Sequence, residues 1–239
     1  WVLNGAKIFI TNAATKVTLG STVQAVTGEH QGDKIFTTLI VPQDTKGFIA
    51  SEMHGKMMWR ASNTAQLFFD DCRVPHDYVL GKIGEGSKIM LSTLDAGRLA
   101  IGAMGLGLAQ GAFELALKYA QERKQFGKPI SKFQAIAFKL ADMATKIEAA
   151  RNLLYKACWL KDNHKPYAIE AAMSKLYCSE VAREVADEAV QVHGGYGLMK
   201  DYDIERFYRD QRLLLIGEGT SEIQRMVMSR HLGCKRDFK

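Results

Sequence analysis

The spacing of apolar residues changes near residues 81–86, and this change constrains the fold more than any other feature of the sequence. Before it, short runs rich in Val, Ile, Thr and Phe end at turn-forming residues, which is typical of antiparallel strands. These runs are KIFI, STVQAV, KIFTTLIV and AQLFF. After it, apolar residues recur every three or four positions, which indicates helices. We therefore predict an α+β chain with an antiparallel sheet or open β-barrel domain over 1–85 and a helical domain over 86–239.

The helical half predicts a mostly antiparallel four-helix bundle. Its elements are expected near 87–125, 131–162, 167–192 and 219–232, with a shorter helix near 203–212. Pro129 and Pro166 fall outside these helices or at their first turns, where a missing N–H costs nothing. Asp95 and Arg98 lie one turn apart, a spacing typical of an intrahelical ion pair. Because the chain opens at Trp1 inside a strand pattern, we expect the β domain to be incomplete at its N-terminus.

Charge and cysteine usage exclude several classes of protein. The 32 Lys and Arg residues are interspersed with 26 Asp and Glu residues, giving a net charge of +6 and no basic arm of the kind that binds nucleic acid. A solvated surface explains this charge, and a phosphate-bearing small molecule is the alternative. We find no apolar run near the roughly 18 residues of a membrane span and no metal-ligand spacing. The widely separated cysteines indicate reduced thiols; they are Cys72, Cys158, Cys178 and Cys234.

Two motifs occur at the expected ends of helices. RKQFG, residues 123–127, places cations where they favour the negative end of a helix dipole. HGGYG, residues 193–197, has the glycines of a left-handed helix stop, or else exposes backbone for the close approach of a ligand. Gly105, Gly107 and Gly111 look like a dinucleotide loop, but they lie inside a helical pattern, which favours close helix packing instead.

The segment IGEGTSEIQR, residues 216–225, places Glu218 between two glycines directly after an apolar run. One interpretation is a helix start, in which Ser221 and Gln224 form a capping box and the acid suits the positive end of the helix dipole. The other interpretation is a role in catalysis. Flanking glycines let the backbone approach a bound group, so the carboxylate could act as a general base beside an apolar wall.

Six motifs in this order resemble the acyl-CoA dehydrogenase family over essentially the whole chain. They are NGAKIFITN (4–12), FDDCRVP (69–75), LDAGR (94–98), ERKQFG with FQ (122–127, 133–134), QVHGGYG (191–197) and EGTSEIQR (218–225). The resemblance implies that a β-barrel and a C-terminal bundle pack with an N-terminal helical domain around FAD, in a homotetramer or homodimer that completes the cofactor site. That N-terminal domain is missing here, so we expect the 239-residue chain alone to hold FAD weakly.

The resemblance also implies a reaction and a set of residues. Glu218 matches the base that takes the C2 proton of an acyl-CoA while a hydride leaves C3 for the flavin N5. The family holds the thioester carbonyl with the backbone N–H of this base and a flavin hydroxyl. The positions that match FAD contacts are Phe9, Ile10, Thr11, Arg123, Gln125, Phe126, Gln134, Gln191, Val192, His193, Gly194, Gly195, Thr220 and Glu222. The positions that match acyl-CoA contacts are Asp95, Arg98, Gly219 and Arg230.

Two positions place the chain within the family. Branched-chain members carry the base on the helix just before the LDxxR arginine, where this chain has Gly97, so the arrangement resembles the short- and medium-chain type, and the short-chain type most closely. Phe9 stands where many members have Trp, which keeps an aromatic ring and loses the indole donor. The expected electron acceptor is an electron-transfer flavoprotein, in the bacterial cytoplasm or the mitochondrial matrix. An acyl-CoA oxidase and an inactive flavin- or CoA-binding module remain alternatives, and acyl chain length stays open.

Overall fold

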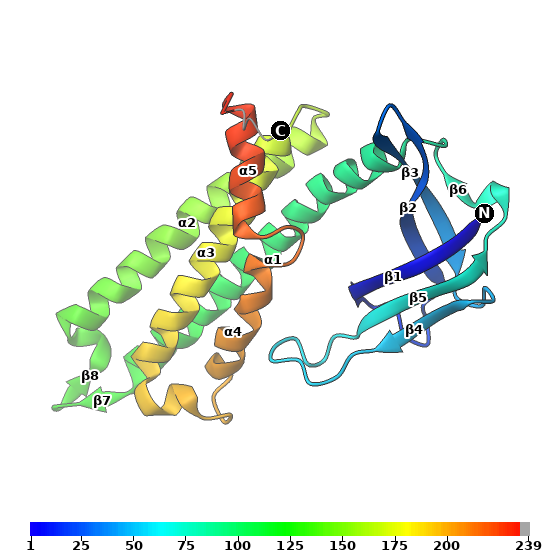
Figure 1. Cartoon of the computed structure of the whole chain (residues 1–239). Helices are drawn as coiled ribbons and strands as arrows, with labels where there is room; N and C mark the ends of the chain where they lie inside the picture. Colours follow the sequence, from blue (N-terminus) through cyan, green and yellow to red (C-terminus); the bar gives the residue numbers. More distant parts are fainter. Residues whose placement is uncertain (235–239) are drawn as a thin grey trace. The chain divides into compact units, whose positions relative to one another are not determined.

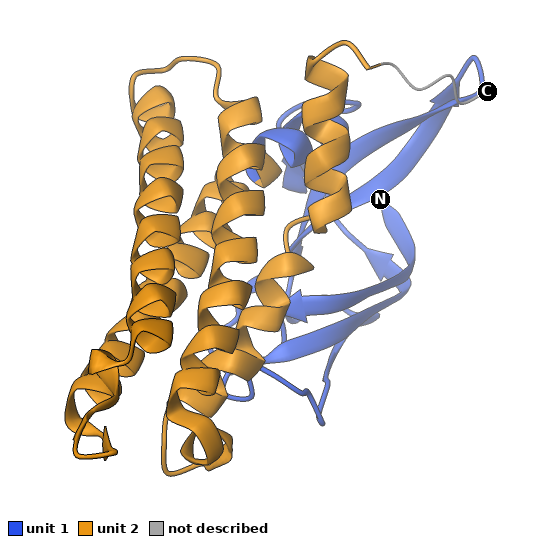
Figure 2. Cartoon of the chain, turned by 90° about the vertical axis from the view of Figure 1, so that its left-hand side faces the viewer, with its two compact units in different colours: residues 1–93 blue, residues 94–239 orange. Residues whose placement is uncertain are grey.

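The computed structural model describes residues 1–234, which fall into two compact units divided between Thr93 and Leu94 (Figure 2). The long helix α1 (Gly86–Glu122) starts in the first unit and continues through the second. We predicted the boundary at the start of this helix. The first two turns instead belong to unit 1, because a Cβ placed on Gly86 would lie 2.7 Å from the backbone of Phe36.

Unit 1 consists of two antiparallel three-stranded sheets, ordered β1-β5-β4 and β2-β3-β6 (Figure 1). Each of the four predicted strand segments lies inside one of the longer strands β1, β2, β3 and β5. Residues of both sheets share one apolar core, in which Leu39, Val41 and Leu67 are almost completely buried. The elements are β1 (Val2–Thr11), β2 (Gly20–His30), β3 (Asp33–Pro42), β4 (Phe48–Glu52), β5 (Thr64–Arg73), a 3-10 turn (His76–Tyr78) and β6 (Val79–Leu80).

Unit 2 is an antiparallel helical bundle, as predicted. Helices α2 and α3 lie side by side, and α4 and α5 pack against α3 (Figure 1). After α1 the elements are the hairpin β7 (Lys124–Gln125) and β8 (Lys128–Pro129), α2 (Gln134–Asp162), α3 (Ala168–His193), α4 (Ile204–Asp210) and α5 (Ser221–His231). Short 3-10 helices cover Ile130–Lys132, Gly194–Leu198 and Gln211–Leu215.

The predicted bounds of two helices were wrong. Helix α1 ends at Glu122 rather than near 125, because Lys124 and Gln125 pair with β8 in a hairpin. Its two turn residues, Phe126 and Gly127, both have positive φ, as the tight turn of a two-residue hairpin requires. Helix α2 starts at Gln134 rather than near 131, because Ile130–Lys132 form a 3-10 turn and Phe133 is the extended N-cap.

Close packing explains two of the three motif glycines of α1, Gly105, Gly107 and Gly111. A Cβ on Gly105 would lie 2.8 Å from the carbonyl oxygen of Cys178, so α1 and α3 approach almost backbone to backbone. A Cβ on Gly111 would lie 2.8 Å from the ring of Phe207 in α4. Gly107, in contrast, has nothing within 4 Å. The close-packing interpretation is therefore confirmed for Gly105 and Gly111 and wrong for Gly107.

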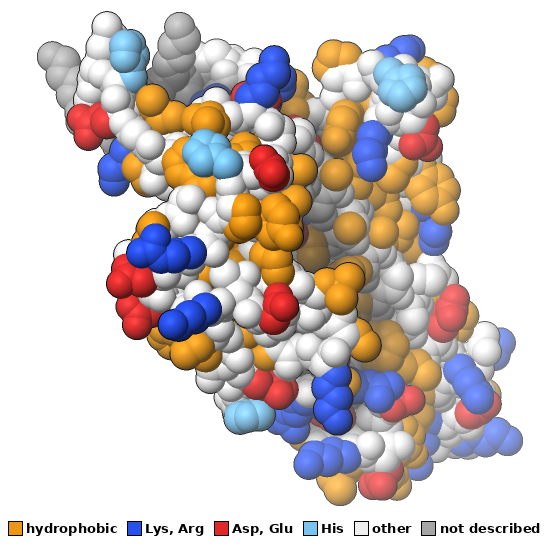
Figure 3. Space-filling view, turned by 90° about the vertical axis from the view of Figure 1, so that its right-hand side faces the viewer, with side chains coloured by type: hydrophobic (Ala, Val, Ile, Leu, Met, Phe, Trp, Pro, Cys, Tyr) orange, Lys and Arg blue, Asp and Glu red, His pale blue; other side chains and the backbone are white. Residues whose placement is uncertain are grey.

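Helix α1 is long and apolar enough to cross a membrane by length and composition, although the sequence pattern did not single it out. In its most apolar 18-residue window, 44% is buried inside the protein, and a single such helix is weak evidence for a membrane span. Charged side chains of both signs are interspersed on the face shown in Figure 3. The four cysteines are free thiols, and no cluster of metal-ligating side chains occurs among residues 1–234.

Candidate active site

Glu218 lies in an unusual backbone conformation between the last 3-10 helix and α5. Its φ is +54°, a left-handed value that few residues other than glycine adopt, and Gly219 follows with a φ of +90°. The side chain of Glu218 is exposed on unit 2. Of the apolar run that precedes it, Leu214 and Leu215 are buried, whereas Ile216 is 52% exposed, so only part of the run is available for the expected apolar wall.

Helix α1 faces the carboxylate of Glu218 at Gly97. A Cβ added to Gly97 would lie 2.6 Å from Oε2 of Glu218, closer than any real contact, so the carboxylate occupies the space that a side chain at position 97 would need. One residue further along, Arg98 is 5% exposed and its Nη1 donates to Oδ1 of Asp95 at 2.5 Å. The predicted ion pair is therefore present.

Two buried polar side chains hold the loop from inside, and sequence reasoning missed both. Lys175 on α3 donates from Nζ to the carbonyl oxygen of Gly219 at 2.7 Å. Gln224 on α5 donates from Nε2 to the same oxygen at 3.0 Å and to the carbonyl oxygen of Glu218 at 3.2 Å. The signal for Lys175 was available, since this lysine interrupts an apolar stripe at helical spacing that contains Ala171, Ala172 and Cys178.

Burial strongly affects the charge of Lys175. The pKa of Lys175 is lowered from 10.5 to about 8, mainly because burial removes hydration; repulsion by Arg98 adds to this net shift, and the negative charges of Glu218 and Glu222 oppose it. The interior beside the loop therefore contains two cations, Arg98 and Lys175. The first is paired with Asp95, and the second is drawn toward the acids of the loop and of α5.

The start of α5 differs from the predicted capping box. The N-cap is Thr220, whose Oγ1 accepts a hydrogen bond from the backbone N–H of Ile223 at 3.3 Å. Ser221 is instead the first helical residue, and Gln224 turns inward to the loop carbonyls. The pKa of Glu222 is lowered by its own backbone N–H and by the Thr220 hydroxyl. The predicted cofactor residues Thr220 and Glu222 thus lie together at a helix N-terminus, which suits anions.

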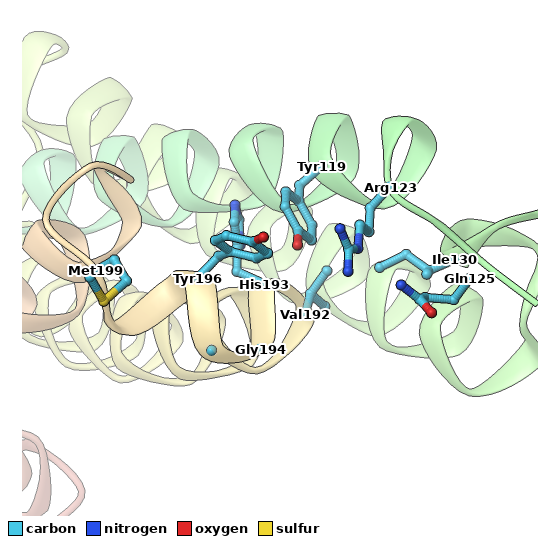
Figure 4. Close-up of a pocket in the computed structure, with 10 residues that line it drawn as sticks. Tyr119, Arg123, Gln125, Ile130, Val192, His193, Gly194, Tyr196 and Met199 are labelled. Carbon is cyan, nitrogen blue, oxygen red and sulfur yellow. The ribbon is translucent and has the colours of Figure 1, made fainter.

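A separate cleft of about 470 Å³ lies at the other end of the bundle, between the end of α1 and the loop after α3 (Figure 4). It brings together six of the predicted cofactor residues. They are Arg123, Gln125, Val192, His193, Gly194 and Gly195, and the cleft is completed by Tyr119, Ile130, Tyr196 and Met199. Figure 4 shows Tyr119, Arg123 and Tyr196 directed into the same space. The guanidinium of Arg123 lies 5.5 Å from the centre of the Tyr196 ring.

The local sequence explains the walls of this cleft. Helix α3 ends at His193, and Gly194 has a φ of +60° with a ψ of −140°, so the glycine stops the helix with a positive φ but not in the predicted left-handed helical conformation. His193 is buried, stacks on Tyr119 at 4.4 Å and donates from Nδ1 to the carbonyl oxygen of Ala189 at 2.7 Å. Burial lowers the pKa of His193 and raises that of Tyr119. Both rings are therefore neutral near pH 7, and Arg123 provides the positive charge of the cleft.

The remaining predicted site residues do not line this cleft. Gln134 and Gln191 are exposed and lie close in sequence to the cleft residues Ile130 and Val192. Phe126 is 91% exposed at the tip of the β7–β8 hairpin. Phe9, Ile10 and Thr11 belong to unit 1, where Phe9 has a φ of +61° at an irregularity of β1 and is 69% exposed. Arg230 is exposed in the last turn of α5.

An aromatic side chain directed outward by a local break in a strand is available to a ligand rather than to the core. Such an exposed ring is what the prediction for Phe9 requires.

The chain matches two family models along its length. Residues 1–72 match the middle domain of acyl-CoA dehydrogenases, and residues 84–233 match their C-terminal domain. A probable acyl-CoA dehydrogenase of Bacillus subtilis is 51% identical over 97% of this chain, and an acryloyl-CoA reductase (NADH) of Anaerotignum propionicum is 47% identical over 97%.

The chain spans 61% and 58% of the lengths of these two relatives. The structure of butyryl-CoA dehydrogenase from Megasphaera elsdenii superposes with a TM-score of 0.93 at 44% identity, covering 97% of this chain and 60% of that one. Together with the matched domains, these similarities show that the chain belongs to the acyl-CoA dehydrogenase family, whose members are flavoprotein oxidoreductases that bind FAD.

Proposed function

We propose that the full-length protein is an FAD-dependent dehydrogenase that converts a short- or medium-chain acyl-CoA to the trans-2-enoyl-CoA, with Glu218 as the base. The observation that carries this proposal is the geometry of Glu218. Glu218 has an exposed side chain and a left-handed backbone, and α1 has Gly97 at the point where a Cβ would collide with its carboxylate. A base must lie within hydrogen-bond reach of the proton it removes, so a carboxylate held outward at a fixed point meets the first requirement of the reaction.

The chemistry requires the base to be held still. The C2 proton beside a thioester is weakly acidic, so its removal depends on a correctly oriented carboxylate and on stabilisation of the negative charge that develops on the carbonyl oxygen. Glu218 takes the proton, and its own backbone N–H is available for that oxygen. Asp95 holds Arg98 by a hydrogen bond, and both are positions proposed to contact acyl-CoA, together with Gly219 and Arg230.

The cleft at the end of α1 fits the FAD of this family. Its volume is within the range of roughly 300–1,000 Å³ found for small-molecule sites. Arg123 supplies a cation for a diphosphate, Gly194 and Gly195 expose backbone without side chains, and the Tyr119 and Tyr196 rings give flat apolar walls. FAD, when bound, supplies the acceptor for the hydride that leaves C3.

Position 97 supports a straight-chain substrate. The alternative base of branched-chain relatives would stand at Gly97, and the structure has no room there for a second side chain while Glu218 is in place. The reverse reaction is a second candidate, favoured by the 47% identity to the acryloyl-CoA reductase. Because any reaction path is the same in both directions, Glu218 would then return a proton to C2.

We further propose an electron-transfer flavoprotein as the redox partner and a homotetramer or homodimer as the assembly. The assembly is proposed from the family resemblance, and Phe126, which is 91% exposed on the hairpin that carries Gln125 of the cleft, is the candidate contact. An acyl-CoA oxidase would use the same base and differ only in whether oxygen reaches the reduced flavin.

The test is anaerobic addition of butyryl-, octanoyl- and isovaleryl-CoA to the FAD-loaded full-length protein. Bleaching of the flavin with butyryl- or octanoyl-CoA supports dehydrogenation, and a preference for isovaleryl-CoA argues against the straight-chain assignment. Air and an electron-transfer flavoprotein are then added in separate samples. Fast reoxidation by air alone indicates an oxidase. Failure of all three substrates to bleach the flavin overturns the proposed function.

A further inference from the structure

Lys175 is the largest fully buried side chain among the described residues, with 0% of its surface exposed. It projects from α3, whose other buried residues are small or apolar except for Ser174, Ser179 and His193 in the last turn. An ammonium group in such a place is unusual, because burial removes its hydration. An apolar side chain of the same length would fill the volume without that loss. The presence of a charge therefore calls for an interaction that an apolar side chain cannot make.

That interaction is with the loop at the candidate base. The ammonium donates to the carbonyl oxygen of Gly219, the residue directly after Glu218, at 2.7 Å. Gln224, which is also fully buried, donates to the same oxygen and to the carbonyl oxygen of Glu218. Two successive carbonyls of the loop are thus drawn toward the interior, and the side chain of Glu218 is left on the outside.

The loop needs such a restraint. Glu218 has a φ of +54°, which is unfavourable for a residue with a Cβ, and such a conformation persists only where its surroundings enforce it. Gly219 cannot be replaced to stiffen the loop, because its φ is +90° and a Cβ would lie 2.9 Å from Nε2 of Gln224. The carboxylate meanwhile sits against Gly97, where a small rotation of the backbone would move it.

We propose that Lys175 is a positioning residue for the reaction: by holding the carbonyl oxygen of Gly219, it fixes the left-handed backbone at Glu218 and keeps the carboxylate against Gly97. Lys175 does not touch the substrate in this role. It acts through the peptide that follows the base, and Gln224 shares the task from α5. This inference rests on the proposed function, since it concerns how the base of that reaction is held.

Charge supports the same arrangement. Glu218, Glu222 and Arg98 are the charged groups that act on Lys175, from the loop, from α5 and from α1 respectively. The two acids attract the ammonium toward the loop, whereas Arg98 repels it and is itself paired with Asp95. The net effect favours a lysine extended toward Gly219.

The test compares Lys175→Met with wild type in anaerobic single-turnover flavin reduction by butyryl-CoA, using the FAD-loaded full-length protein. Methionine is an unbranched side chain only one atom shorter than lysine, and it removes the donor and the charge, so the bundle should remain packed. Because a misplaced base loses rate, we expect the rate at saturating substrate to fall by about ten- to a hundredfold. We expect the amplitude of flavin reduction, the FAD content and the substrate concentration for half-maximal rate to stay close to those of wild type.

Amplitude and rate separate positioning from a merely structural role. A protein that is partly unfolded reduces less flavin but does so at the wild-type rate, whereas a protein with a displaced base reduces all of its flavin slowly. Gln224→Met removes the second donor to the same carbonyl and should also slow the rate, which tests the proposal if Lys175→Met does not hold FAD. The matched control is Lys146→Met, because Lys146 bonds Glu184 between α2 and α3 at the half-exposed surface. This control should reduce flavin at the wild-type rate.

Each outcome decides one question. If wild type reduces no flavin with any acyl-CoA, the proposed function fails. If wild type is active and both Lys175→Met and Gln224→Met keep their FAD and the wild-type rate, the positioning role is wrong. The same conclusion follows if these variants lose amplitude but not rate. Full amplitude with a slow rate in either variant, together with an unchanged Lys146→Met control, supports it.

Discussion

At the scale of single residues, the site depends on where side chains are missing as much as on where they are present. Gly97 leaves the space that the carboxylate of Glu218 occupies, and Gly219 leaves space for the amide of Gln224. The acid and both glycines can be recognised in the sequence because they are adjacent or belong to motifs. The lysine that holds them cannot be recognised in the same way, because Lys175 is 43 residues from Glu218 in the chain (218 − 175) and only folding brings it to the loop.

Positions 97 and 218 can be tested as alternative sites for one base. We expect Glu218→Gly alone to be nearly inactive and the double variant Glu218→Gly with Gly97→Glu to recover measurable flavin reduction, because the two positions face each other. The assay uses butyryl-, octanoyl- and isovaleryl-CoA under anaerobic conditions. A double variant that keeps its FAD and binds acyl-CoA, yet is no faster than Glu218→Gly with all three, would show that position 97 does not face the substrate C2.

The depressed pKa of Lys175 also predicts how stability depends on pH. Lys175 has a pKa of about 8 in the folded state and 10.5 when unfolded, so it releases a proton on folding between these pH values. Above pH 10.5 Lys175 is neutral in both states and burying it carries no charge penalty. This part of the stability is lost as the pH falls through 8, because a charged Lys175 must then be buried. Between these values, the free energy of unfolding of wild type should rise relative to that of Lys175→Met by up to about 1.4 kcal/mol per pH unit. Urea unfolding at pH 7.5, 8.5 and 9.5 measures the difference, and parallel curves would contradict the pKa shift.

At the scale of secondary-structure elements, the packing of α1 against α3 is a close contact of unit 2. The position of α1 along α3 is fixed where their backbones approach at Gly105. The type and order of the main elements were predictable from periodicity, because period-two and helical spacing are strong signals over long segments. The ends were less predictable. Lys124 and Gln125 continue the helical pattern in sequence but pair across a hairpin, and the cap of α5 moved from Ser221 to Thr220 because Gln224 bonds the loop instead of completing a capping box.

Gly105 and Gly107, two residues apart on α1, give a matched test of this packing. Gly105→Ala places a Cβ 2.8 Å from the Cys178 carbonyl, and neither backbone can yield easily, so we expect a loss of about 1–3 kcal/mol in the free energy of unfolding. Gly107→Ala meets nothing within 4 Å and should be neutral or stabilise by up to about 1 kcal/mol, because alanine favours helix. Urea unfolding of both variants checks the prediction. Equal effects would contradict the close approach of α1 to α3.

At the scale of the whole molecule, the predicted site residues lie in several separate parts of the chain. The sequence motifs identify these residues but do not show which of them come together in the fold. Six predicted cofactor residues meet in one cleft of unit 2, whereas Phe9, Ile10 and Thr11 lie in unit 1 and Gln134 and Phe126 point outward. Local motifs identify such residues because each motif has its own spacing. Their assembly depends on surfaces that a single chain leaves open, so we propose that a second copy covers the β7–β8 hairpin.

The hairpin gives a test of that assembly. Phe126→Ser removes the 91% exposed ring and leaves the two-residue turn, so each chain should fold as before. We expect the variant to form smaller assemblies than wild type and to lose FAD more readily on gel filtration, because burial of an apolar ring stabilises an interface. Analytical ultracentrifugation and the flavin absorbance of the protein peak measure both effects. An unchanged assembly with full FAD would contradict a role of Phe126 between subunits.

The central claim is that Glu218 removes the C2 proton. Its most direct test is the rate of flavin reduction by butyryl-CoA in the full-length Glu218→Gln protein, because glutamine keeps the size of the side chain and cannot accept the proton. We predict that this variant retains FAD and binds acyl-CoA but reduces flavin slower by about three orders of magnitude or more. A variant that retains more than about a tenth of the wild-type rate would contradict the account.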